Sequence, residues 1–399
     1  MSNAAVMATY GRMNVTFSRG EGVWLWDTEG KRYLDALSGI AVCGLGHAHP
    51  RLAAALCEQA SQLWHTSNLY RIEWQERLAE TLARKTGLDA AFFANSGAEA
   101  NEAAIKLARL YGHRKGIECP VIVSMEGSFH GRTMGSLSAT GNKKVHQGFT
   151  PLLEGFVRVP YGDFAALQAV VDATPAAVAV LVEPVQGEGG IVIPPADYLP
   201  QIRALCDRAG LLLMVDEVQT GMGRTGTWFG FEHAGIRPDV VSLAKGLGNG
   251  FPIGACVAGG AAASVLQPGT HGSTFGGNPL AACVAYTVCD ILETTDLPAR
   301  AGALGAAVLS HFRDRLGKRA GVVDIRGKGL MIGLELDRPC GELVGKALAN
   351  GLLINVTAER VVRLLPPLVM SDDEAAQMVD GVSTLIETFL DEAASPTSV

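Results

Sequence analysis

An acidic and a basic residue each follow an apolar run in the middle of the chain. Asp216 ends the run of residues 211–215, and Lys245 follows the end of the run at 240–244. Both runs are typical of buried strands in an α/β sheet, and open sheets of this kind bind ligands at the carboxyl ends of their strands. An acid that can pair with a ring nitrogen and an amine that can form an imine are the minimum requirement for pyridoxal phosphate chemistry.

Lys245 has two interpretations. Most lysines are solvated surface residues, and this one would then have no chemical role. The apolar residues before it and the glycine-rich segment 246–250 after it favour a partly desolvated position at a strand end. Desolvation lowers the pKa of an amine, which makes it a better nucleophile.

Two nucleotide-binding alternatives compete for Asp216. An apolar run ending in Asp-Glu also suits Mg²⁺ binding in phosphate-loop ATPases, but no Gly-Lys pair of the chain is followed by Ser or Thr. Residues 221–226 match Gly-x-Gly-x-x-Gly, but residues 216–220 separate them from the strand and an aromatic segment at 228–231 replaces the helix. Both alternatives are therefore discarded as main interpretations. Tight adenine-nucleotide binding by a protein that shows no cofactor absorbance would favour nucleotide binding by residues 221–226.

Residues 96–101 precede a strongly helical run at 102–110. Ser96 and Glu99 have the spacing of a capping box, which predicts the start of a helix. The free N–H groups and the dipole at such an N-terminus also favour an anion, and Gly97 permits close approach. The segment is therefore either a capped helix alone or a capped helix that holds a phosphate.

Three further segments could contribute to a site. Phe129 is either a core residue or a platform for a planar cofactor, and Arg132 is either a surface charge or a bidentate clamp for a carboxylate. The glycine-rich segment 271–279 is either a helix-entry turn or a further set of phosphate donors. His47 and His49 lack a third ligand nearby, so no metal site is expected.

The composition limits the class of protein. With 399 residues, 48% hydrophobic and 18% charged, the chain is long enough for two domains or one large α/β unit. The net charge of -7 without a basic cluster argues against a nucleic-acid partner. No run of about 18 apolar residues occurs, so no membrane span is expected. Without Cys-x-x-Cys pairs or a recognisable signal peptide, a cytoplasmic location is expected.

The elements that would position these residues follow from the hydrophobic pattern. Between about residue 52 and 294, apolar runs alternate with amphipathic stretches, which predicts a mostly parallel sheet covered by helices. The runs include 121–124, 178–182, 211–215, 240–244 and 253–258, and the helices include 99–112, 164–173, 198–209 and 277–293. After about residue 295, helices at 297–316, 342–349 and 374–391 surround strands near 330–336, 352–356 and 361–365. We predict a smaller α+β domain here, joined by a hairpin at 23–37.

Taken together and in this order, the segments resemble the class III aminotransferases of PLP fold type I, from about Tyr10 to about Ile386. The resemblance rests on Asp-Glu-Val-Gln at 216–219, Arg-Thr-Gly at 224–226, the position of Lys245 and Gly-Ser-Thr-Phe-Gly-Gly-Asn-Pro at 272–279. It implies an α/β fold: a large domain with a mostly parallel, seven-stranded sheet flanked by helices, plus a smaller α+β domain built from both termini. The expected bounds are 55–294 for the large domain, and 1–54 with 295–399 for the small one.

The resemblance also implies pyridoxal 5′-phosphate as the cofactor and assigns roles around its ring. Lys245 would bind it covalently and, when displaced by substrate, carry the proton in catalysis. Asp216 would pair with the ring nitrogen and keep it protonated. Gln219 would bond the ring oxygen, and the ring would lie between Phe129 and Val218.

The phosphate contacts implied by the resemblance come from two places. Ser96, Gly97 and Ala98 would hold the phosphate. Thr274, with Ser273, would reach the phosphate of the neighbouring subunit's cofactor, and Ser273 is also counted among the substrate-binding residues. The resemblance thereby implies a homodimer with shared active sites.

Two arginines and a glutamate would bind substrates. Arg132 would bind the carboxylate of acetylornithine and the distal carboxylate of glutamate, and Arg363 would bind the α-carboxylate of glutamate. Glu188 would pair with Arg363 when the amine substrate is bound, because a paired arginine presents no free charge to an uncharged arm of the substrate.

Within the class, residues 39–42, 45–47 and 93–97 are most similar to members that act on N²-acetylornithine. We therefore expect transfer of its terminal amino group to 2-oxoglutarate, giving N-acetylglutamate 5-semialdehyde and glutamate in arginine biosynthesis. The alternatives are other ω-amines (succinylornithine, ornithine, succinyl-diaminopimelate or 4-aminobutyrate) and an aminomutase of the same fold. Ala98 where the class often has Thr, Cys43 in place of Asn and Asn14 in place of Pro depart from the pattern.

Overall fold

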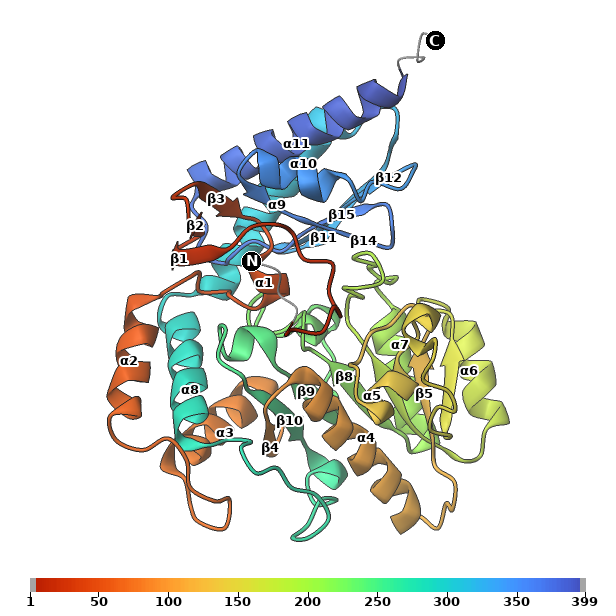
Figure 1. Ribbon diagram of the computed structural model, residues 1–399. Coiled ribbons are helices and arrows are strands. Elements are labelled where there is room, and N and C mark those ends of the chain that lie inside the picture. The colour runs from red at the N-terminus through yellow and green to blue at the C-terminus, as the bar shows by residue number, and fades with distance from the viewer. Residues whose placement is uncertain (1–4, 395–399) are drawn as a thin grey trace.

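A seven-stranded sheet forms the centre of the computed structural model, which describes residues 5–394 (Figure 1). The strand order is β4-β10-β9-β8-β7-β5-β6. The bounds are β4 (Ala90–Ala94), β5 (Val121–Met125), β6 (Phe156–Val159), β7 (Ala177–Val182), β8 (Leu212–Asp216), β9 (Val240–Leu243) and β10 (Gly254–Ala258). Only β10 runs antiparallel to its neighbours, so the sheet is mostly parallel, as predicted.

Helices cover both faces of this sheet, because its strands are apolar on both sides. In β8, Leu212 and Met214 pack into the core beneath α4 (Gly97–Arg114), whereas Leu213 and Val215 belong to the core on the opposite face. The opposite face is covered by α3 (Glu73–Thr86), α7 (Tyr198–Ala209) and α8 (Pro279–Thr294). α2 (Pro50–Ala60) packs on α8, and α6 (Phe164–Ala173) packs on α7.

The parallel strands place their following residues at one edge of the sheet. Asp216 is the last residue of β8, and Lys245 lies two positions beyond the end of β9. Glu183 follows β7 directly and lies beside Asp216, because Val182 pairs with Val215 in register. This edge is where an open parallel sheet binds its ligand.

The two ends of the chain meet in a second sheet. β1 (Phe17–Glu21), β2 (Trp24–Asp27) and β3 (Arg32–Asp35) form an antiparallel unit that contains the predicted hairpin. β13 (Leu352–Leu353) pairs with β3 in parallel, Leu352 with Leu34. Figure 1 shows the N-terminal strands, in red, beside the C-terminal elements, in blue.

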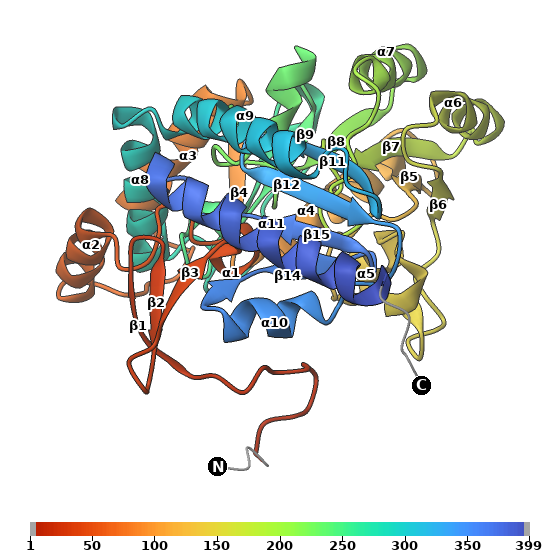
Figure 2. The same ribbon diagram turned by 90° about the horizontal axis from the view of Figure 1, so that it is seen from above.

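A third sheet, of order β11-β12-β15-β14, completes the C-terminal part. Its strands are β11 (Val322–Lys328), β12 (Met331–Leu336), β14 (Asn355–Thr357) and β15 (Val361–Leu364). α9 (Leu297–Leu316) packs on β11 and on α11 (Asp372–Ala394), and α10 (Leu343–Ala349) also packs on α11. Figure 2, seen from above, shows α9 and α11 lying across this sheet.

Two expectations for this part were incomplete. The strand predicted near 352–356 is divided between β13 and β14, which belong to different sheets. β11 was not predicted, because Ile325 is its only fully buried residue and no alternation of apolar residues marks it. The division of the chain at 54 and 294 stays a prediction, and residues 1–4 and 395–399 of that division lie outside the described part.

The remaining helices are short. They are α1 (Ser38–Ala41), α5 (Met134–Ala139) and the 3₁₀ helices η1 (Lys143–His146), η2 (Gly230–Ala234), η3 (Lys245–Leu247) and η4 (Gly260–Ala262). No helix between residues 5 and 394 combines the length and the apolar character that a membrane crossing needs.

Candidate active site

A cavity of about 390 Å³ opens at the carboxyl edge of the seven-stranded sheet. All residues predicted for the site line it except Ser273, Thr274 and Arg363. They come from five places: the start of α4, the loop after β5, the loop after β7, the end of β8 and the turn after β9. The predicted ring contacts and the predicted phosphate contacts at the start of α4 are thus brought to one cavity, together with Arg132 and Glu188.

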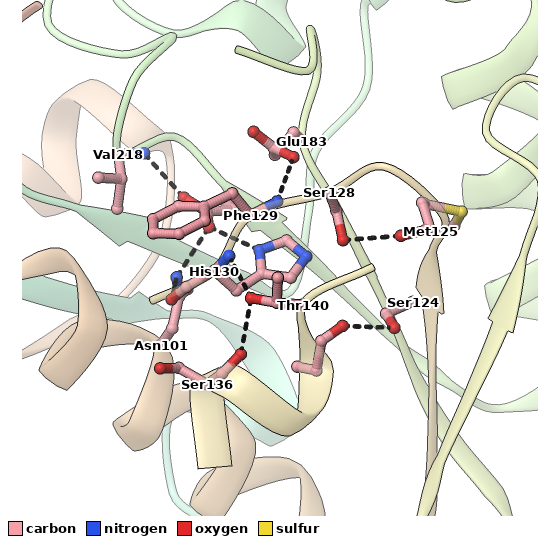
Figure 3. Close-up of polar contacts among 12 residues, drawn as sticks. Asn101, Ser124, Met125, Ser128, Phe129, His130, Ser136, Thr140, Glu183 and Val218 are labelled. Atoms are coloured by element: carbon pink, nitrogen blue, oxygen red, sulfur yellow. Dashed lines mark hydrogen bonds and ion pairs between the residues drawn. The ribbon is translucent and has the colours of Figure 1, made fainter. Parts of the chain in front are cut away.

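Asp216 lines this cavity and is held by three N–H donors, from Asn101, His130 and Val218, which Figure 3 labels. Its Oδ2 accepts hydrogen bonds from Asn101 Nδ2 at 2.7 Å and from His130 Nδ1 at 2.8 Å. Its Oδ1 accepts from the backbone N–H of Val218 at 3.0 Å. Asn101 also donates to the carbonyl of His130 at 2.8 Å, so the orientation of the Asp216 carboxylate is fixed from two elements.

Lys245 begins the short helix η3 with a backbone φ of 45°. A positive φ is uncommon for a residue with a side chain, and such strain is concentrated at functional sites. Burial lowers the pKa of the Lys245 amine, although the carboxylate of Glu188 opposes this shift. A lower pKa increases the fraction of neutral amine, which is the nucleophilic form.

The N-terminus of α4 points into the cavity with Ser96 as its cap. Ser96 Oγ accepts from the Glu99 N–H at 3.2 Å, as the capping-box spacing predicts. In a capping box the glutamate side chain also accepts from the N–H of the cap residue, here Ser96. Here Glu99 Oε2 accepts instead from the N–H of Asn95, at 2.8 Å. The first N–H groups of a helix have no partner within it, so this end of α4 can bind an anion.

Gly97 allows that approach. A Cβ at this position would lie 2.7 Å from Val218 Cγ1, closer than side chains tolerate, so a glycine is needed between α4 and Val218, two residues beyond β8. The helix N-terminus and the Val218 side chain therefore share one wall of the cavity.

Phe129 and Arg132 follow β5 in one loop. Phe129 is half-buried, and its N–H donates to Glu183 Oε2 at 3.2 Å. Arg132 is exposed at the cavity mouth, with its guanidinium carbon 5.6 Å from the centre of the Phe129 ring. A planar ligand on Phe129 would therefore lie within reach of a cation that can bind a carboxylate in two-point fashion.

Arg363, in β15, enters the site through an ion pair. Its Nη1 lies 2.6 Å from Glu188 Oε1, and its Nη2 donates to Asn355 Oδ1 at 2.8 Å. Arg363 is 1% exposed, whereas Glu188 lines the cavity. Burial opposes ionisation of Glu188, but the positive charges of Arg363 and Lys245 outweigh it and lower its pKa.

Ser273 and Thr274 lie outside the cavity of their own chain. Ser273 Oγ accepts from the N–H of Gly276 at 3.0 Å and lies 3.4 Å from the side-chain nitrogen of Asn95, which lines the cavity. Thr274 is exposed. Their predicted contact with a neighbouring subunit stays a prediction.

Three buried residues of the site were not recognised in the sequence: Asn101, His130 and Glu183. His130 lies inside the segment 128–133 that drew attention to Phe129 and Arg132. Glu183 carries the same signal as Asp216, an acid directly after an apolar strand. Asn101 is a polar residue on the buried face of α4, among Ala100, Ala103 and Ala104, and that contrast was its signal.

The donor set fits pyridoxal phosphate. It offers a helix N-terminus for phosphate, a carboxylate for a ring nitrogen, an amine for an imine and an aromatic side chain for stacking. Gln219 Oε1, which is buried and has no hydrogen-bond partner among the described residues, adds a polar atom in the same wall. Within residues 5–394, no group of three His, Cys, Asp or Glu side chains could hold a metal ion.

Comparison with known proteins agrees with this set. The family model described as aminotransferase class-III matches residues 5–386. A relative named acetylornithine aminotransferase, from Nitrosomonas europaea, is 59% identical over 386 residues, which cover 97% of this chain and 98% of the relative.

Two solved structures have the same fold over nearly the whole chain. An ornithine aminotransferase from Toxoplasma gondii, whose description records partial occupancy of PLP at its active site, is 35% identical with a TM-score of 0.94 and covers 98% of this chain and 94% of its own. An N-acetylornithine aminotransferase from Stenotrophomonas maltophilia K279a is 36% identical with a TM-score of 0.84 and covers 96% of this chain and 98% of its own.

Proposed function

The chain belongs to the class-III aminotransferase family, and from this membership we propose how its own residues carry out transamination. Its activity is the PLP-dependent transfer of the terminal amino group of N²-acetylornithine to 2-oxoglutarate, which gives N-acetylglutamate 5-semialdehyde and glutamate in arginine biosynthesis. Near full-length similarity to acetylornithine aminotransferases supports the substrate. The observation that supports the chemistry is the meeting of Asp216 and Lys245 at one cavity.

When bound, pyridoxal phosphate supplies an electron sink for the carbon that loses a proton. In our proposal the Lys245 amine binds this cofactor and afterwards moves the proton at the reacting carbon. Asp216, oriented by Asn101, His130 and Val218, would hold the proton of the ring nitrogen.

The other cofactor contacts follow from the walls of the cavity. Ser96, Gly97 and Ala98 at the start of α4 would hold the phosphate, and Phe129 and Val218 would hold the ring. Gln219 bonds the ring oxygen. The geometry supports these roles because all of these side chains or backbone groups line one cavity.

Substrate recognition would use the two arginines in different ways. Arg132, exposed at the cavity mouth, binds the carboxylate of acetylornithine and the distal carboxylate of glutamate. Arg363 binds the α-carboxylate of glutamate after Glu188 moves away. The 2.6 Å pair supports this, since a paired Arg363 offers no free charge to the amine substrate.

We further propose a cytoplasmic homodimer whose sites share Ser273 and Thr274. Exposed apolar side chains in one segment support an interface beside this loop: Trp64, Leu69 and Tyr70 are 64%, 88% and 72% exposed. Asn68, in the same segment, donates to the carbonyl of Ser273 at 2.9 Å. Exposed apolar groups of this size mark interaction surfaces.

The first experiment follows the cofactor absorbance of the purified protein. N²-acetylornithine should bleach the band near about 400–430 nm, and 2-oxoglutarate should restore it. If the band is present but ignores acetylornithine while another ω-amine bleaches it, the substrate is that amine. If no band forms after pyridoxal phosphate is added, the assignment of Lys245 is wrong.

A further inference from the structure

Glu183 is a buried carboxylate at the cavity for which the reaction above has no use. It is 6% exposed and lies beside Asp216 at the ends of two adjacent strands. The hydroxyl of Tyr161 donates to its carbonyl at 2.9 Å and so fixes its main chain. Because an ionised carboxylate is costly to bury, the contacts that its side chain makes are informative.

The two oxygens of Glu183 accept from the backbone of two different loops. Oε2 accepts from the N–H of Phe129 at 3.2 Å, and Oε1 accepts from the N–H of Gly187 at 3.4 Å. Figure 3 shows the first of these bonds, from Glu183 to the backbone beside the Phe129 ring. One carboxylate therefore connects the loop after β5 with the loop after β7.

Both connected loops carry residues of the site. The first holds Phe129 and Arg132. In the second, a Cβ on Gly187 would overlap Gln219 Oε1, so its backbone lies directly against Gln219, and the next residue is Glu188. A displacement of the Gly187 backbone would therefore move both Gln219, the proposed contact to the ring oxygen, and Glu188, the partner of Arg363.

We propose that Glu183 is a positioning residue that holds these two loops in one arrangement, so that Phe129 and the Glu188–Arg363 pair keep a fixed relation. The inference rests on the proposed roles of Phe129 and Glu188. Burial raises the pKa of Glu183 to about 7, with His130 opposing the shift and Asp216 adding to it, which agrees with a carboxyl enclosed between the two loops.

The chain offers a matched control in Glu217. It is also buried, burial likewise raises its pKa to about 7, and its side chain accepts from the backbone N–H groups of Gly230 and Phe231, each at 2.9 Å, and from the Thr220 hydroxyl at 2.5 Å. None of Glu217 and these three partners lines the cavity. Glu183→Gln and Glu217→Gln therefore make the same chemical change in two buried carboxyl groups that each accept from two backbone N–H groups.

Glutamine keeps one acceptor oxygen and replaces the other with an amide that can only donate, so one backbone N–H in each variant loses its partner. Hydrogen exchange on the cofactor-loaded enzyme should then rise about tenfold in peptides covering 126–133 or 184–191 for Glu183→Gln. For Glu217→Gln the increase should be confined to the peptide covering 228–232. This readout requires no turnover.

Single-turnover spectra supply the second readout. Glu183→Gln should lower kcat/KM about tenfold for the acetylornithine half-reaction, more than for the glutamate half-reaction, because only the former needs Glu188 held on Arg363. Glu217→Gln should leave both half-reactions within about twofold of the unmodified enzyme.

The proposal is overturned if exchange at 126–133 and 184–191 is unchanged in Glu183→Gln. It is also overturned if Glu217→Gln slows the half-reactions as much as Glu183→Gln does, since the loss would then come from general destabilisation. Failure of the proposed function is a separate result: the unmodified enzyme would not bleach with acetylornithine, while the exchange experiment would still test the connection between the loops.

Discussion

Glu188 and Arg363 form an ion pair, 2.6 Å between Oε1 and Nη1, that joins the loop after β7 to β15. One partner lines the cavity and the other is 1% exposed. An arginine buried this deeply without its carboxylate would be an uncompensated charge, which is costly. The pair is therefore suited to an exchange in which a substrate carboxylate replaces that of Glu188.

The first prediction concerns this pair. Glu188→Gln should raise the ratio of kcat/KM for glutamate to kcat/KM for acetylornithine by about tenfold or more, because glutamate no longer has to displace a carboxylate. The measurement is the rate of each half-reaction by absorbance. Glu359→Gln, which removes an exposed partner of Lys144, is the control and should leave the ratio unchanged. An unchanged ratio in Glu188→Gln would show that the pair does not control substrate choice.

A second prediction concerns Lys245. Lys245→Ala should fold with an unchanged melting temperature, because the residue is half-buried and starts a short helix. It should bind pyridoxal phosphate without a covalent bond. Borohydride reduction followed by peptide mass analysis should therefore mark the unmodified enzyme at Lys245 and leave the variant unmarked. Marking of another lysine in the unmodified enzyme would contradict the assignment.

A third prediction concerns Gly131, which packs against the start of α4, where the phosphate is proposed to bind. Its φ is 134°, and a Cβ there would lie 2.4 Å from Ser136 Oγ and 2.7 Å from the Cβ of Ala98. Gly131→Ala should lower the free energy of unfolding by about 2–4 kcal/mol and weaken pyridoxal phosphate binding, because α4 must move. Gly148 also has a positive φ, 84°, but a Cβ there would meet open space. Gly148→Ala should therefore lower the free energy of unfolding by only about 1 kcal/mol and leave cofactor affinity unchanged. Equal effects of the two changes would exclude the contact with Ala98 as the cause.

The pH dependence of stability should depend on His47. Its hydrogen bond to Asp35, 2.8 Å long, raises its pKa from 6.5 to about 9. A raised histidine pKa stabilises the fold fully below the unfolded value and loses that contribution as the pH rises through the folded value. His47→Gln should therefore be less stable than the unmodified protein near about pH 6, by on the order of 1–3 kcal/mol, and the gap should narrow towards about pH 9.5.

Urea unfolding across that range measures the gap. His233→Gln is the control, because burial lowers the pKa of His233 below 6.5, so its own contribution changes as the pH falls through about 6.5 and is constant above about pH 7.5. Above about pH 7.5 the difference in unfolding free energy between His233→Gln and the unmodified protein should therefore stay constant, while the gap for His47→Gln still narrows. A gap for His47→Gln that does not vary with pH would mean that the pair with Asp35 is not charged.

The helices and the sheet edge could be predicted because their signals are local. The helices at 164–173, 198–209 and 297–316 were predicted to the residue, since amphipathic spacing and flanking breakers fix their ends. Asp216 and Lys245 were placed at strand ends because each follows an apolar run. Glu183 follows one too, and the same rule would have identified it.

Other parts depend on contacts that no local pattern encodes. Asn101 donates to Asp216, which lies 115 positions away in the sequence. A polar side chain on a buried helix face can bond to many different groups, so the sequence alone does not identify its partner. β13 is two residues long and pairs with β3 near the other end of the chain. The reciprocal bond of Glu99 went to Asn95, because Asn95 offers both a backbone and a side-chain donor to the same oxygen.

The parallel pairing of β3 with β13 has a consequence for how the protein is made. β3 ends at Asp35 and β13 begins at Leu352, so ribosomes that add about 5–20 residues per second need tens of seconds between the two. During that time the N-terminal strands have left the ribosome while one edge of their sheet stays open. An open strand edge favours pairing with other chains. The outer edge of β3 is therefore open to pairing with other chains until Leu352 has been made.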